Sequence, residues 1–130
     1  MSDTAEFASF DEFFPFYCGE HGKPLTRWMH FAGTHAAGAV AATALARRRP
    51  TLLLAAPVVS YGAAWLSHAL VERNRPATFT HPLWSLRGDF VMIGMMWKGR
   101  DAEIQTMADR ARLQRPIVLQ PAQPDSAPAA

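Results

Sequence analysis

Two long apolar runs separated by a short basic turn dominate the chain. Residues 28–46 contain nineteen consecutive positions without a formal charge, and residues 51–71 contain twenty-one. A helix needs ~20 apolar residues to cross a bilayer. The intervening Arg47–Pro50 predicts that the two runs fold into an antiparallel helical hairpin embedded in a membrane. The alternative is a buried helix pair in a soluble bundle, but so short a chain could hardly cover two helices that are apolar all round.

Shorter patterns precede the hairpin. Residues 7–17 place three phenylalanines at helical spacing with acidic residues on another face. This pattern predicts a short amphipathic helix, which either lies at a membrane interface or packs against the core. Glycines and a proline then break the chain over residues 18–25, and Thr26 is placed to cap the following helix.

The C-terminal third predicts two helices and a tail. The apolar stretch Phe90–Trp97 is too short to cross a bilayer and suits an interfacial or re-entrant helix. Residues 100–115 read as a charged surface helix, and residues 116–130 contain four prolines. We therefore expect an all-α protein. It would consist of a single helical membrane domain over residues 1–115, a hairpin or bundle with interfacial helices, and a disordered Pro/Ala-rich tail over residues 116–130.

Composition narrows the classes of partner and chemistry. Charged residues make up 18% of the chain, below the roughly 25% of ordinary soluble domains. The net charge of +2 is too small to favour a nucleic acid as partner, so we expect none, and the apolar runs favour a lipid bilayer. The single cysteine, Cys18, excludes an intrachain disulfide. The acidic start lacks the pattern of a cleavable signal peptide, and no phosphate loop, serine-hydrolase elbow or paired-cysteine zinc motif occurs.

Histidine is the residue type here best suited to holding a transition metal. His68 and Glu72 are four residues apart, which places both on one face of a helix. They could chelate one cation together, or Glu72 could orient the ring of His68. A hydrogen-bonded structural pair at a membrane boundary is the alternative.

The hairpin topology brings distant histidines to one end of the fold. His30 begins the first apolar run and His68 lies near the end of the second, and His21 precedes the first run closely enough to fold over the same end. An ionisable residue inside an apolar segment is costly and indicates function by default. We therefore predict that these three histidines and Glu72 converge on a metal site.

The two remaining histidines are weaker candidates as metal ligands. His35 follows His30 by five residues, which places it ~140° round the helix, so the two cannot easily bind one ion. We interpret His35 as a packing residue or one that supports a ligand. His81 lies in a predicted loop and could either reach the same end or stay solvated.

Three segments in order resemble a known family: "FYCGEHGKPLTRWMHFAGT", "YGAAWLSHALVERNRPATF" and "HPLWSLRGDF". The motifs are a His followed by x-x-Pro, a second His heading an apolar helix, and G/S-H-x-x-x-E-x-x-x-P-A, in which Ser67 stands where glycine is usual. Over Phe10–Lys98 the chain resembles the family of the iron-dependent 2-hydroxy fatty acid (2-hydroxypalmitate) dioxygenase of fungal α-oxidation, long filed as a domain of unknown function.

The resemblance implies Fe(II) as cofactor and dioxygen and a 2-hydroxy fatty acid as substrates, the acid losing one carbon. By position, it implies His21, His30 and His68 as the essential histidines, with Glu72 nearby. An arginine could pair with the substrate carboxylate, because a guanidinium forks onto it. The candidates are Arg27, Arg73 and Arg75, for which contact with lipid headgroups is the alternative.

Two rival functions stay open at this point. The chain could be a non-enzymatic membrane scaffold with structural histidines, or a membrane zinc hydrolase; a homo-oligomer is also compatible with the sequence. The short, basic, Pro/Ala-tailed chain looks bacterial, which favours the inner membrane. Three arginines lie at the hairpin turn and five basic residues near the other end, so the positive-inside rule favours cytoplasmic termini.

Overall fold

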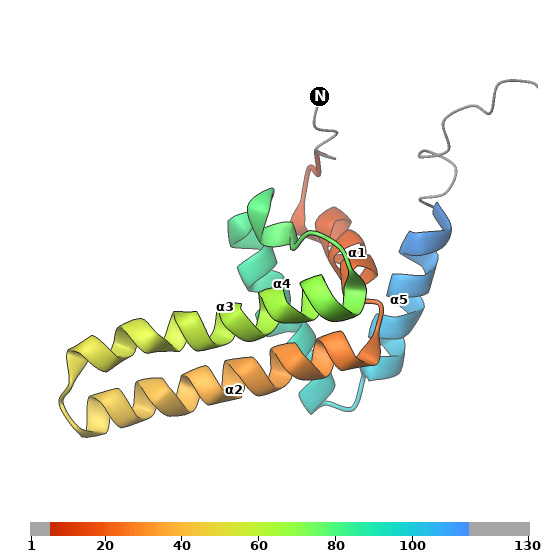
Figure 1. Cartoon of the computed structure of the whole chain (residues 1–130). Helices are drawn as coiled ribbons and strands as arrows, with labels where there is room; N and C mark the ends of the chain where they lie inside the picture. Colours follow the sequence, from red (N-terminus) through yellow and green to blue (C-terminus); the bar gives the residue numbers. More distant parts are fainter. Residues whose placement is uncertain (1–5, 115–130) are drawn as a thin grey trace, which may run out of the picture.

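The computed structural model describes residues 6–114, and within that range the chain is helical with no strand (Figure 1). The predicted all-α class is therefore confirmed for these residues. The predicted tail over residues 116–130 lies outside them, so the division into a domain over 1–115 and a tail stays a prediction. The elements are α1 (Phe10–Glu20), α2 (Pro24–Ala46), the 3₁₀ helix η1 (Pro50–Leu54), α3 (Ala55–Ser67), the π-helix η2 (His68–Glu72), the 3₁₀ helix η3 (Ala77–Phe79), α4 (Pro82–Trp97) and α5 (Asp101–Gln114).

The predicted helical hairpin is present. Helices α2 and α3 run side by side and project away from α1, α4 and α5, which gather round their other end (Figure 1). The chain turns over Arg47–Arg49, where Arg48 takes a left-handed conformation with φ of 50°. The two helices approach closely at Gly33, where an added Cβ would lie 2.5 Å from the Cβ of Ala63. Small residues thus set the spacing of the hairpin.

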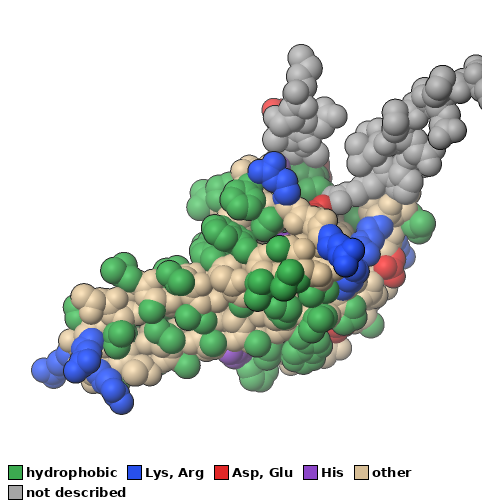
Figure 2. All heavy atoms as spheres, in the orientation of Figure 1, with side chains coloured by type: hydrophobic (Ala, Val, Ile, Leu, Met, Phe, Trp, Pro, Cys, Tyr) green, Lys and Arg blue, Asp and Glu red, His purple; other side chains and the backbone are tan. Residues whose placement is uncertain are grey.

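The two arms of the hairpin differ in how apolar they are. Among the described residues, one continuous helical stretch, Pro50–Glu72, is long and apolar enough to cross a bilayer, with 23 residues and a mean hydropathy of 1.3. Helix α2 has the length but does not meet this measure, because glycine, threonine and histidine lower its mean hydropathy. The expected membrane hairpin is therefore supported by length and hydropathy in one of its two arms. Figure 2 shows hydrophobic side chains along the hairpin and basic ones at its tip.

The main core lies where α1 meets α4 and α5. One face of α1 buries Phe13, Tyr17 and Cys18 completely, so this helix packs against the core, which was one of the two predicted possibilities. The predicted charged helix is α5, but it also adds Ile104 and Ala108 to the core. The stretch Phe90–Trp97 forms the second half of α4, which buries Met92, Ile93 and Met95.

One proline position corrects a local prediction. Helix α2 begins at Pro24 with Lys23 as its N-cap, so Thr26 lies inside the first turn instead of capping it. The fixed φ of proline suits the first helical position, and this signal outweighs the threonine. Pro57 lies in the first turn of α3, directly after η1.

The contact at Gly33 generates a stability prediction. We expect Gly33→Ala to destabilise the protein by ~1–3 kcal/mol, because the new methyl group overpacks against Ala63. Gly38→Ala on the same helix is the control: its Cβ would meet nothing within 4 Å, and alanine favours a helix by up to ~1 kcal/mol. Thermal unfolding in detergent, followed by circular dichroism, should give a lower Tm for the first variant only. Equal Tm values would contradict the proposed close approach.

Candidate metal centre

Three histidines from three separate elements meet at the base of the hairpin. His21 directly follows α1, His30 lies in the second turn of α2, and His68 begins η2. The Nε2 atom of His21 lies 3.1 Å from the Nε2 atoms of both His30 and His68. All three ligand atoms lie within 4.8 Å of one another, so the predicted convergence of these three residues is present.

Each of these rings is buried and held by its other nitrogen. The residues are 1%, 4% and 2% exposed in chain order. In each ring Nδ1 lies at hydrogen-bond distance from an oxygen: the Tyr17 carbonyl for His21 at 2.7 Å, the Thr26 carbonyl for His30 at 2.9 Å, and Asn74 Oδ1 for His68 at 2.7 Å. A carbonyl oxygen can only accept, so each neutral ring carries its proton on Nδ1.

This tautomer leaves three Nε2 lone pairs facing one another. Neutral rings of this kind cannot hydrogen-bond to each other through Nε2, so at 3.1 Å their lone pairs repel unless a cation lies between them. Burial, together with the neighbouring His30 and His68, holds the pKa of His21 well below its usual value, which disfavours a proton in that place. Two nitrogens bound to one metal at ~2.1 Å lie ~3.0–3.4 Å apart. The two separations of 3.1 Å from His21 therefore fit a shared transition metal, and His68 and His30 lie within reach of the same centre.

The side chains of Asn74 and Glu20 hold the ring of His68 in its orientation. Asn74 Nδ2 donates to the Glu20 side chain at 2.6 Å and to the Glu20 carbonyl at 3.1 Å, which turns Asn74 Oδ1 toward His68. The π-helix η2 and a left-handed Arg73 make this possible, because they fold Asn74 back so that its N–H donates to the His68 carbonyl. Sequence reasoning missed both supporting residues, although Glu20 adjoins His21 and Asn74 lies in the quoted "VERNRP" segment.

Glu72 does not join the three histidines. Its Oε1 accepts from the backbone N–H of Lys23 at 2.6 Å, and its Oε2 pairs with Arg112 at 2.8 Å. Glu72 lies in the π-helix η2, so its direction relative to His68 differs from the one that α-helical spacing predicts. Asn74 orients the ring in the way predicted for Glu72, which instead ties the start of α2 to α5.

The other two histidines lie apart from this cluster. His35 is exposed; its Nδ1 lies 2.7 Å from the Phe31 carbonyl and its Nε2 accepts from Trp97 at 3.0 Å. His35 therefore links α2 to α4, in line with the packing role expected for it. His81 caps α4 and stacks on Trp84 with the ring planes 3° apart.

The three candidate arginines have different surroundings. Arg27 is fully buried, with two bonds to Asp101 at 2.8 and 2.9 Å and one from Nη1 to the His21 carbonyl at 2.9 Å. Its guanidinium is therefore used to hold the His21 segment against α5. Arg73 and Arg75 are exposed.

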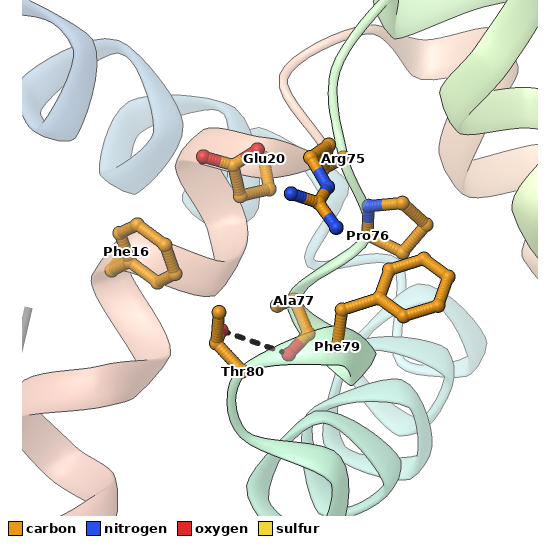
Figure 3. A pocket seen from close by; sticks show the side chains of 7 residues that line it. All are labelled: Phe16, Glu20, Arg75, Pro76, Ala77, Phe79 and Thr80. Atoms are coloured by element: carbon orange, nitrogen blue, oxygen red, sulfur yellow. Dashed lines mark hydrogen bonds between the residues drawn. The ribbon is translucent and has the colours of Figure 1, made fainter. Parts of the chain in front are cut away.

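A pocket of about 440 Å³ lies between α1 and η3 (Figure 3). Glu20 comes from α1 and Arg75 from the segment before η3, and apolar side chains form much of the remaining wall. Because Glu20 also holds Asn74, which in turn holds His68, only Asn74 separates this wall from the histidine cluster along that path. The lining residues are Phe16, Glu20, Arg75, Pro76, Ala77, Phe79 and Thr80.

A tyrosine and an aspartate, neither of them predicted, lie beside the cluster. The Tyr17 hydroxyl donates to Asp89 Oδ1, and that oxygen lies 4.0 Å from His30 Nε2. Burial raises the pKa of Asp89 to about 6 despite the bond from Tyr17. Burial also raises the pKa of neighbouring Cys18 to about 12, which favours the protonated thiol.

Comparison with known proteins places the chain in a family. It matches no curated protein and no solved structure. Residues 7–101 match the family described as "2-hydroxy-palmitic acid dioxygenase Mpo1-like". The matched range contains all three clustered histidines together with Asn74 and Asp89. Since this range covers well over half of the chain, the protein belongs to the Mpo1-like family.

Proposed function

We propose that this protein is an Fe(II)-dependent dioxygenase that shortens 2-hydroxy fatty acids by one carbon. The observation that carries the proposal is the set of three buried Nε2 lone pairs within 4.8 Å of one another, in a family described by dioxygenase activity on 2-hydroxy-palmitic acid. The substrates are a 2-hydroxy fatty acid and dioxygen, as the family description and the resemblance imply.

His21, His30 and His68 are the proposed iron ligands. Histidine ligands with further positions left open suit a ferrous oxygenase. When bound, the iron supplies a site for dioxygen and the electron transfer that the oxidation needs. The protein supplies the rest: Tyr17, Thr26 and Asn74 fix the three ring orientations through Nδ1.

The pocket between α1 and η3 is the proposed site for the head of the substrate. Arg75 there can pair with a carboxylate, because guanidinium groups bind carboxylates through two parallel hydrogen bonds. The apolar wall formed by Phe16 and Phe79 suits the first methylene groups of an acyl chain. Arg27 is a weaker candidate for this role, because Asp101 and the His21 carbonyl already use its donors.

We further propose that the hairpin lies in a bilayer. The stretch Pro50–Glu72 has the necessary length and hydropathy, and only 17% of its most apolar part is buried inside the protein. His68 lies near one end of this stretch, so the site would lie close to the membrane surface, where a fatty acid presents its head. The excess of basic residues at that end favours termini on the cytoplasmic side of the membrane.

A membrane zinc hydrolase is the second candidate, because three histidines with an open position also form catalytic zinc sites. Zinc has no redox chemistry, so oxygen dependence separates the two functions. A scaffold with structural histidines would purify without stoichiometric metal.

The first prediction of the proposed function concerns metal content. We expect His21→Ala, His30→Ala and His68→Ala each to lose most bound iron, because each removes one of three converging nitrogens. His35→Ala and His81→Ala are matched controls that should keep it, since both rings lie outside the cluster. Elemental analysis of the detergent-purified proteins, reconstituted with Fe(II) without oxygen, measures this. Full iron content in any of the first three variants would argue against the assigned ligand.

The second prediction concerns turnover. The iron-loaded protein should consume 2-hydroxypalmitate only with dioxygen, in step with oxygen uptake, and should release the acid that is one carbon shorter. Mass spectrometry and an oxygen electrode follow both changes. The zinc-loaded protein and an anaerobic sample should be inactive; product formation in either one would overturn the dioxygenase proposal.

The third prediction concerns the membrane. Val58 is 71% exposed on the apolar stretch, so Val58→Asp should reduce the fraction of protein retained in alkali-washed membranes, at a cost of ~2.5–3.5 kcal/mol for a charge near the middle of a bilayer. Leu113→Asp is the control, because Leu113 is equally exposed but lies on α5. Equal retention of both variants would exclude insertion of this stretch.

A further inference from the structure

The histidine cluster has no negative charge of its own. Three neutral imidazoles leave a bound divalent cation with its full charge, in a site where all three residues are at most 4% exposed. Burying a charge is costly unless an opposite charge lies near it. Arg27, whose Nη1 donates to the His21 carbonyl, does not change this requirement, because Asp101 already pairs with it.

Two carboxylates near the cluster are used elsewhere. Glu72 binds the Lys23 backbone and Arg112, and Glu20 accepts from Asn74. Arg112 therefore already offsets the charge of Glu72, and Asn74 stands between Glu20 and the ring of His68, so neither carboxylate meets a ligand nitrogen.

Asp89 is positioned differently. Its Oδ1 lies 4.0 Å from His30 Nε2, the ligand atom itself, and its side chain is 20% exposed. It comes from α4, which contributes none of the three histidines. Two ligand atoms at ~2.1 Å from one ion lie between ~3.0 Å and ~4.2 Å apart, depending on the angle. A distance of 4.0 Å therefore brings Asp89 next to an ion held by His30.

The position of Asp89 is built into the packing of α1 and α4. Tyr17 is fully buried, its ring stacks on His21 with the centroids 4.1 Å apart, and its hydroxyl donates to Asp89. Residue 88 is a glycine, and a Cβ there would lie 2.9 Å from the Tyr17 ring. This glycine lets α4 approach closely enough for Tyr17 to touch both a histidine and the carboxylate.

We propose that Asp89 is the anionic member of the metal centre, oriented by Tyr17, and that it offsets the charge of the ion held by the three histidines. The inference rests on the metal site of the proposed function. It does not depend on the reaction that the metal supports.

The test is metal affinity. Asp89→Asn keeps the shape of the side chain and its contact with Tyr17 but removes the charge. The full-length apo-protein in detergent is titrated with Co²⁺, as a stable substitute for Fe²⁺, against a competing chelator. We expect the variant to bind ~10–100-fold more weakly than wild type, with an altered visible absorption spectrum of the bound Co²⁺. Asp11→Asn, on the exposed face of α1, is the matched control and should bind like wild type.

The outcomes are distinct. Wild-type affinity in Asp89→Asn overturns the proposal. If that variant does not fold, Asp89→Ser, which also removes the charge but is smaller, gives the same decision. A wild-type protein that binds no Co²⁺ overturns this inference together with the metal site. If wild type binds Co²⁺ but its iron form shows no dioxygenase activity, the function fails, while the ratio of affinities still decides the role of Asp89.

Discussion

The structure depends on how three histidine protons are placed. Each ring donates a hydrogen bond from Nδ1–H to a fixed oxygen, so the three Nε2 lone pairs face one another in a buried space. Without a cation this arrangement is repulsive, and with one it becomes a set of donors already in place. The surrounding helices are best understood as the means by which this electrostatically costly group is held together.

Three long-range contacts provide that support. Gly33 and Ala63 set the distance between the hairpin arms, which places His30 opposite His68. Arg27 holds the carbonyl of His21 and is held in turn by Asp101 on α5. Asn74, which donates to Glu20, fixes the orientation of the His68 ring. The helices α1, α4 and α5 therefore do more than cover the base of the hairpin, because they determine where its polar groups point.

The pattern of apolar runs predicted the helical hairpin, and hairpin topology alone brought His30 and His68 to one end. His21 could be added because it closely precedes the first run. The supporting groups were beyond sequence reasoning. Helical spacing pointed to Glu72, but the π-helix changed the register, and the partner of His68 became Asn74. Asp89 was missed because α4 carries no histidine. Its place beside the cluster depends on the packing of Gly88 against Tyr17, which the sequence does not show. The suitability of α2 for crossing a bilayer was overestimated, because a helix with few formal charges can still have too low a mean hydropathy.

The π-helix at His68–Glu72 has a consequence for the tolerance of this segment to length changes. One residue more than an α-helical turn is accommodated between Ser67 and Arg73. The π-helical turn absorbs this extra residue locally, so the helix before it and the chain after it keep nearly the directions that an uninterrupted α-helix would give them. A change of one residue in length there would alter the local loop that returns the Asn74 N–H to the His68 carbonyl, without redirecting the rest of the fold.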